Sequence, residues 1–203
     1  MATAAFERAL AHLDMALPTS RAAVRRAIGS SVARLLLDFV PRPRRRPPES
    51  EVARLGEAAR IMRELVWVDV FGNPERVVVD SLGAINAGRR AGVLGFETMG
   101  WSGLAFALAF VGRERLSKSL MQRALALSER VEDPGIRALT LQLAQDVAYI
   151  WGDFERAAQM GEAALARYRQ LGDIQGAGAA QLFLGYDADM NGDFERALAS
   201  ADR

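Results

Sequence analysis

The chain has 203 residues, half of them hydrophobic and a quarter charged, and its formal net charge is +1. It holds no cysteine and one histidine, His12, which excludes disulfides and thiolate chemistry and leaves no basis for a histidine metal site or catalytic triad. No apolar stretch approaches the roughly 20 residues of a membrane-spanning helix, and the first residues do not resemble a signal sequence. A cytoplasmic location is therefore expected.

Residues 1–40 are predicted to form an N-terminal helical segment, made of half a repeat and a basic amphipathic helix. The half repeat starts at Phe6-Glu-Arg-Ala, a motif that returns twice later in the chain. The basic stretch follows from Arg21 to Val40. Charge is unevenly distributed, because residues 1–48 carry nine arginines against three acidic residues.

Residues 41–50 are predicted to be a linker between two helical blocks. The prolines of the segment Pro41-Arg-Pro-Arg-Arg-Arg-Pro-Pro48 favour an extended, solvated chain. The alternative is that this segment contacts an anionic surface, either nucleic acid or a membrane. The residues that would make this contact are Arg42, Arg44, Arg45 and Arg46. The linker is the preferred interpretation, since hardly any aromatic residue lies nearby to stack on bases, and neither nucleic acid nor a membrane is the expected partner.

Residues 51–203 are predicted to form helical repeats, of which the last is truncated. The hexapeptide that begins at Gly152, Gly-Asp-Phe-Glu-Arg-Ala, recurs unchanged from Gly192, and steps of 40 residues back from Gly152 lead to Gly112 and Gly72. A glycine at a constant step indicates a repeat array. Between the glycines, apolar residues return every three or four positions, as in a helix. Each step of 40 is therefore expected to hold a pair of helices.

The turn chemistry predicts where these helices begin and end. Glycine at the end of a helix adopts a left-handed conformation without steric cost, and Asp153 and Asp193 can cap the helix that follows. The expected helices span residues 95–111, 114–131, 135–151, 154–171, 175–191 and 194 onward, with a weaker pair at 51–70 and 74–91.

The last repeat resembles the tetratricopeptide repeat. Phe183-Leu184-Gly185 is similar to its Leu-Gly pair, Gly192-Asp193-Phe194 to its turn, and Ala197 to the small residue of its second helix. That repeat has about 34 residues, and a step of 40 resembles the longer variant of large bacterial signalling ATPases, including those fused to class III nucleotide cyclases, Ser/Thr kinases or LuxR-type regulators. The resemblance implies an all-α, right-handed α-solenoid of antiparallel helix pairs. The sequence departs from the pattern at Gly112, which lacks the Asp-aromatic pair, and at Ala144-Gln145, where Leu-Gly is expected.

The resemblance implies a non-catalytic protein–protein interaction or regulatory scaffold module, as a fragment of a larger signalling protein. The sequence contains no phosphate-binding loop and no cyclase or kinase motif, so neither enzymatic activity nor a cofactor is expected. The alternative is a fragment of an ATPase-coupled nucleotide cyclase or kinase whose catalytic domains lie outside the chain. The expected partner is a protein or peptide segment, or another domain of the same parent protein. Because both ends look like half repeats without polar caps, self-association is also expected.

The first helices of successive pairs are expected to line a concave groove that holds a peptide. The predicted inward residues combine aromatic, amide and acidic side chains, which suits a basic peptide. They are Ser102, Phe106, Gln142, Asp146, Tyr149, Tyr186 and Asp189. The alternative is that these are ordinary solvated or interhelical residues.

Two further sets of residues are predicted to be structural. Trp67, Trp101 and Trp151 fall out of register with the repeat, which favours core packing over a role as ligand platforms. Asp187 and Asp189 are two positions apart on a helix and point to different sides, so no metal site is predicted there.

Overall fold

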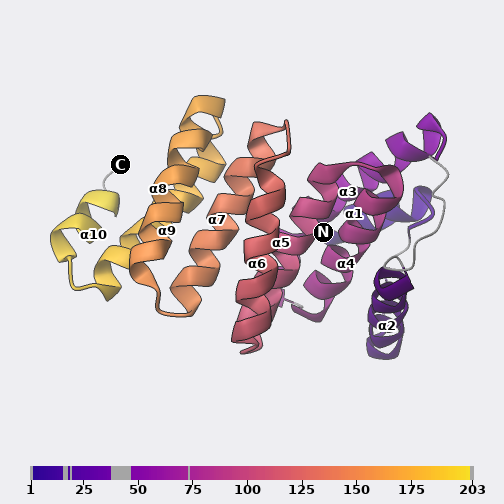
Figure 1. The fold of residues 1–203 in the computed structure, drawn as a ribbon, viewed down its shortest axis with the longest axis horizontal. Helices are drawn as coiled ribbons and strands as arrows, with labels where there is room; N and C mark the ends of the chain where they lie inside the picture. Colours follow the sequence, from indigo (N-terminus) through magenta and orange to yellow (C-terminus); the bar gives the residue numbers. More distant parts are fainter. Residues whose placement is uncertain (1, 16–17, 19, 38–46, 73, 202–203) are drawn as a thin grey trace.

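The computed structural model describes residues 2–15, 18, 20–37, 47–72 and 74–201. All regular structure within these residues is α-helical, as the sequence predicts. The helices are α1 (Ala2–His12), α2 (Arg21–Leu37), α3 (Glu49–Gly72), α4 (Pro74–Ala91), α5 (Leu94–Phe110), α6 (Glu114–Ser128), α7 (Pro134–Ile150), α8 (Phe154–Leu171), α9 (Ile174–Met190) and α10 (Phe194–Ala201). Figure 1 shows an elongated array, with the helices up to α4 gathered at one end and α10 at the other.

The observed helix boundaries follow the prediction closely from α5 onward. Helices α5, α7, α8 and α9 begin and end within one residue of the expected positions, and α10 begins at Phe194. Helix α6 is an exception, because it ends at Ser128 and not at residue 131. No glycine follows it, and the chain turns there through a bond from the Val131 N–H to the Ser128 carbonyl (3.1 Å).

The N-terminal part differs more from the prediction. Helix α1 begins at Ala2, so Phe6 lies inside the helix and not at its start. Helix α3 begins at Glu49, which makes the last two residues of the predicted linker helical. The four arginines of that linker, Arg42, Arg44, Arg45 and Arg46, lie outside the described residues.

Local turn chemistry explains the helix ends. Gly172 ends α8 with a φ of 68°, in the left-handed region that glycine enters without cost. The next residue, Asp173, then caps α9, because its carboxylate accepts a hydrogen bond from the Gly176 N–H at 2.9 Å. Gly152 and Asp153 make the same transition between α7 and α8, with a φ of 71° at the glycine and a cap bond to the Arg156 N–H.

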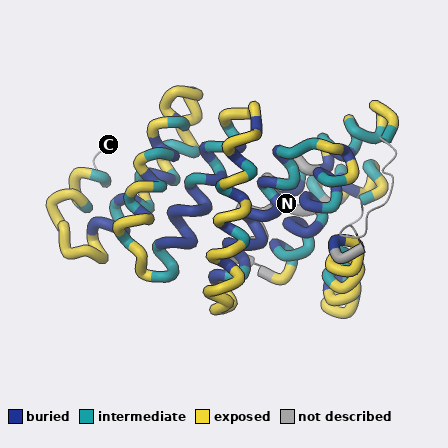
Figure 2. Tube along the Cα trace, viewed as in Figure 1, coloured by how far each residue is buried: buried dark blue, intermediate teal, exposed yellow. Residues whose placement is uncertain are grey.

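The apolar residues form several clusters along the array. The largest joins α4, α5, α6 and α7, and includes Ile85, Trp101, Phe106, Met121 and Leu143. A second cluster links α7, α8 and α9, and a third holds α1 against α3. These clusters bury apolar side chains between neighbouring helices, and Figure 2 shows the buried positions running through the middle of the array.

The tryptophan side chains described by the structure belong to this packing. Trp101 is buried within the largest cluster, and Trp151 is partly buried against it. The side chain of Trp67 lies outside the described part of the chain.

Helix α5 is the most thoroughly buried element, since α4, α6 and α7 all pack against it. Its small residues allow close contact, and a Cβ added at Gly100 would lie 2.6 Å from the Ser81 carbonyl oxygen of α4. No helix among the described residues, α5 included, is long and apolar enough to cross a membrane.

Candidate functional site

The predicted groove residues of α5 do not lie on an open face. Ser102 is fully buried, and its hydroxyl donates within the helix to the carbonyls of Thr98 and Met99. Phe106 is buried in the largest apolar cluster, where its ring meets that of Phe110 edge-on at a centroid distance of 4.9 Å. Helices α4, α6 and α7 all pack against α5, and neither side chain is available to a peptide in this structure.

The predicted residues Gln142 and Asp146 of α7 are also buried. Gln142 accepts a hydrogen bond from the Tyr168 hydroxyl of α8 at 2.7 Å. Asp146 lies one turn further along α7, and neither of its carboxylate oxygens has a hydrogen-bond partner among the described residues. These side chains belong to the interior between α7, α8 and α9.

The remaining three predicted residues lie together at the surface. Tyr149 of α7 is half-buried, whereas Tyr186 of α9 is 46% exposed and Asp189, one turn beyond it, is exposed. The centroids of the two tyrosine rings are 6.5 Å apart. Helices α7 and α9 are in direct contact, which brings these residues to one face although they are far apart in sequence.

Two phenylalanines that were interpreted only as repeat residues complete this face. The ring of Tyr149 lies 5.8 Å from that of Phe154 and 6.1 Å from that of Phe183, and Phe183 lies 5.8 Å from Tyr186. We call Tyr149, Phe154, Phe183 and Tyr186 the aromatic surface. Its members come from α7, α8 and α9, and each retains some exposure to solvent. The sequence signal for Phe154 was its place after the Gly152-Asp153 turn, and no comparable signal pointed to Phe183 as a surface residue.

A layer of buried polar side chains accompanies the aromatic surface. Asp146 and Asp187 are each 1% exposed, and the Gln145 amide donates to a carboxylate oxygen of Asp187 at 3.4 Å. We call Gln142, Gln145, Asp146, Tyr168 and Asp187 the buried polar layer. It holds two carboxylates, and no group of three or more potential metal ligands occurs in the described part of the chain.

Burial dominates the proton affinity of both carboxyl groups. Desolvation raises the pKa of Asp187 from 3.8 to about 6, although the Gln145 amide and the charge of Arg196 act in the opposite direction. Burial also raises the pKa of Asp146 well above its usual value, and the negative charge of Asp187 raises it further. Protonation of at least one of the two carboxyl groups is therefore favoured over two ionised carboxylates at this position.

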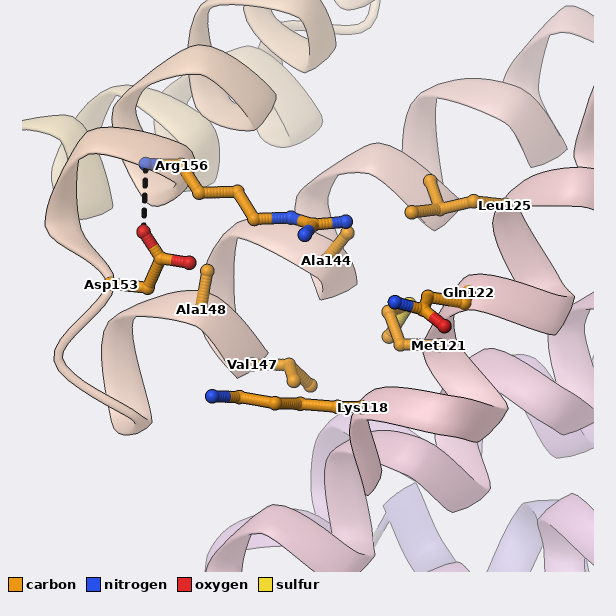
Figure 3. Close-up of a pocket in the computed structure, with 9 residues that line it drawn as sticks. All are labelled: Lys118, Met121, Gln122, Leu125, Ala144, Val147, Ala148, Asp153 and Arg156. Carbon is orange, nitrogen blue, oxygen red and sulfur yellow. Dashed lines mark hydrogen bonds between the residues drawn. The ribbon is translucent and has the colours of Figure 1, made fainter. Parts of the chain in front are cut away.

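A separate cleft of about 110 Å³ opens between α6 and α8, which do not contact each other. Ala144, Val147 and Ala148 of α7 form its apolar floor. Figure 3 shows Lys118 and Gln122 of α6 on one side, with Arg156 of α8 extending over the floor from the other side. The ammonium group of Lys118 is paired with Glu114 at 2.7 Å. The cleft thus offers basic groups over an apolar floor, and the sequence interpretation did not anticipate it.

Comparison with known proteins does not assign the chain to a family. No family model matches the sequence, and a search of the curated proteins gives no match.

Proposed function

We propose that this chain is a non-catalytic module that binds a peptide segment of another protein or of a neighbouring domain. In this proposal, the helix pairs form a right-handed α-solenoid of the tetratricopeptide type with a repeat step of 40 residues. The all-helical array of packed consecutive helices supports the architecture. The Gly-Asp-Phe turns that begin at Gly152 and Gly192 support the repeat.

The aromatic surface is the observation that carries the proposal. Aromatic rings that remain partly exposed are the side chains that most often dominate peptide and protein interfaces, because they supply large contact areas at little cost in side-chain entropy. Here four of them touch edge to face across three helices, which holds their positions without covering them. Such a rigid apolar surface is suited to an extended or helical peptide.

The acidic residues that follow Tyr186 in the sequence indicate which peptide the aromatic surface fits. Asp189 is exposed one turn from Tyr186, and Asp193 and Glu195 follow at the start of α10. An arginine or lysine of the peptide could pair with these carboxylates and stack on the tyrosine rings. The partner class is therefore a basic segment that carries at least one large apolar residue.

The resemblance to the repeat regions of signalling ATPases suggests the setting of this module. We propose that it serves there as a regulatory scaffold, which receives a peptide segment while catalysis takes place in other domains. Its motifs in Phe183-Leu184-Gly185 and Gly192-Asp193-Phe194 are the support for this part of the proposal.

The test is to select peptides from a displayed random library on the full chain and to measure the affinity of the enriched sequences by fluorescence anisotropy. Basic sequences with an aromatic or aliphatic anchor are expected, and Tyr186→Ala should weaken their binding at least tenfold, which corresponds to about 1.4 kcal/mol. Phe110→Ala is the matched control, because this exposed aromatic residue belongs to α5 and its ring meets Phe106, which is not part of the aromatic surface. Unchanged affinity in Tyr186→Ala, or equal loss in both variants, would contradict the assignment of the site.

A further inference from the structure

Helix α10 carries an apolar pair that no part of the described chain covers. Phe194 is 63% exposed and Leu198, one turn later on the same side of the helix, is 69% exposed. Helix α10 packs against α9 alone among the described helices, and Arg196 forms an ion pair with Glu162 of α8. The apolar pair therefore faces away from the contacts that hold the helix in place.

The same five residues occur at the other end of the array. Phe6 to Leu10 and Phe194 to Leu198 both read Phe-Glu-Arg-Ala-Leu, and both segments are helical. In α1, however, Leu10 is fully buried and Phe6 packs against the same cluster. The third copy of the motif, from Phe154, has alanine in place of the leucine, so only α1 and α10 present the complete pair.

The structure of α1 shows which surface fits this pair. Leu10 is buried against Ala58, Met62 and Leu65 of α3, which follow one another at helical spacing and leave room at the alanine for the incoming leucine. Ile61 packs at the edge of this cluster. We call these four residues of α3 the acceptor face.

Helix α1 itself is held by this contact, and just after its end Arg54 of α3 donates a hydrogen bond to the Leu13 carbonyl and Met15 packs against Leu55, Ala87 and Ala91. Among the described helices, α1 packs against α3 and against nothing else, whereas α3 also packs against α4 and α5. Release of α1 would therefore uncover the acceptor face while α3 stays anchored to the array. Helix α10 of another molecule carries the same five residues, Phe-Glu-Arg-Ala-Leu, as α1.

We propose that α10 of one copy of the chain binds the acceptor face of α3 in a second copy, in place of that copy's α1. The contact joins different surfaces of the two molecules, so it is heterologous and can continue from copy to copy as a head-to-tail chain. The internal α1 competes with it, which makes the assembly dependent on concentration. This proposal uses the Phe194 and Leu198 side of α10 and not the aromatic surface, and it does not rest on the proposed function.

The test is to measure the mass of the full chain by sedimentation velocity over about a hundredfold range of concentration. The average mass should rise with concentration in the natural sequence, and Leu198→Asp should abolish the rise. Ala199→Asp places the same charge on the neighbouring exposed position of α10 and is the matched control, which should associate as the natural sequence does. Because Leu198 is exposed, its substitution is not expected to unfold the chain.

A second variant identifies what α10 binds. Leu10→Ala weakens the hold of α1 on α3 and frees the acceptor face, so it should strengthen association about tenfold if α1 and α10 compete. Adding Leu198→Asp to Leu10→Ala should return the chain to a monomer. If Leu10→Ala leaves the association constant unchanged, α10 does not replace α1 on the acceptor face. Association would then be due to pairing between two α10 helices, and the proposal is wrong. If both the natural sequence and Leu10→Ala remain monomeric at every concentration, no second copy occupies the α10 face and the proposal is wrong.

Discussion

Asp146 of α7 and Asp187 of α9 are buried in the same polar layer, and the charge of Asp187 is close enough to raise the pKa of Asp146. Gln145 donates a hydrogen bond to Asp187, whereas the carboxylate oxygens of Asp146 have no partner among the described residues. Two carboxylates in such a position are stable only if at least one holds a proton. The contact between α7 and α9, which supports the aromatic surface, should therefore depend on pH.

The sign of this dependence follows from the raised pKa values. The folded chain binds protons at these groups more tightly than the unfolded chain does, so the stabilisation is complete below about pH 4 and is lost as the pH rises. For Asp187 the loss runs from its ordinary pKa of 3.8 to about 6, and the loss due to Asp146 extends further upward because burial raises the pKa of Asp146 as well. Over this interval the free energy of unfolding should fall by about 1 to 3 kcal/mol.

Asp146→Asn should remove the part of this effect that is due to Asp146 and leave the part that is due to Asp187. The amide has nearly the same shape and carries no charge, so the variant should be more stable than the natural sequence at pH 8 and differ little from it at pH 5. Urea unfolding at the two pH values measures both quantities. A variant that is less stable than the natural sequence at pH 8 would show that the Asp146 carboxylate is stabilised by its surroundings.

Glu97 of α5 is predicted to be an important polar residue of the core. Its Oε1 atom accepts from Arg89 Nε at 3.0 Å and from Trp101 Nε1 at 3.1 Å, and Arg123 approaches to 3.7 Å. Both arginines also lie over the Trp101 ring, at 5.6 and 4.7 Å from its centroid. Glu97→Ala should therefore cost about 3 kcal/mol in thermal or chemical unfolding, because it removes the charged acceptor to which Arg89 Nε and the Trp101 indole N–H donate.

Glu114→Ala is the control for this substitution. It removes the exposed ion pair with Lys118, which should be worth less than about 0.5 kcal/mol. Equal losses in the two glutamate variants would mean that the Glu97 network contributes no more than a surface pair.

Two helical glycines, one packed between α4 and α5 and one on α9, should give opposite results when replaced by alanine. A Cβ at Gly88 would lie 2.4 Å from the backbone nitrogen of Glu97, which belongs to a rigid helix and cannot move aside. Gly88→Ala should therefore destabilise the chain by about 3 kcal/mol. Gly178 of α9 has no atom within 4 Å of the added Cβ, so Gly178→Ala should stabilise it by about 0.5 to 1 kcal/mol through helix propensity. Melting temperatures that shift in the same direction would contradict this account of the contact.

Tyr168 and Tyr186 should respond differently to loss of the hydroxyl group. Tyr168 is buried, and its hydroxyl donates to the Gln142 amide oxygen at 2.7 Å. Tyr168→Phe removes this donor from a buried acceptor, so it should lower the free energy of unfolding by about 1 to 2 kcal/mol. Tyr186 is half-exposed, and Tyr186→Phe should change the free energy of unfolding by less than about 0.5 kcal/mol. Differential scanning calorimetry of the two variants makes the comparison, and a larger loss for Tyr186→Phe would be evidence against the buried polar layer.

The helices of the second half could be predicted from the sequence because their ends depend on local chemistry. A glycine with positive φ and an aspartate that caps the next helix act within a few residues, as at Gly172 and Asp173. Where the glycine and the capping aspartate are missing, as after Ser128 of α6, the predicted boundary was wrong. The placement of α1 was also wrong, because no such signal precedes Ala2.

The exposure of individual side chains was decided by the tertiary structure. Helical periodicity identifies which residues share a face, but it does not say whether another helix covers that face. Ser102 and Phe106 of α5 were predicted to line an open groove and are buried, whereas Tyr149 and Tyr186 meet at the surface because α7 contacts α9.

The pentapeptide Phe-Glu-Arg-Ala-Leu shows the same division within one chain. Its sequence determined that α1 and α10 are both helices with a phenylalanine and a leucine on one side. Only the tertiary structure decided that Leu10 is buried on α3 while Leu198 is exposed. The physical reason is that helix formation depends on neighbours in the sequence, whereas burial depends on which distant helix arrives to cover the apolar face.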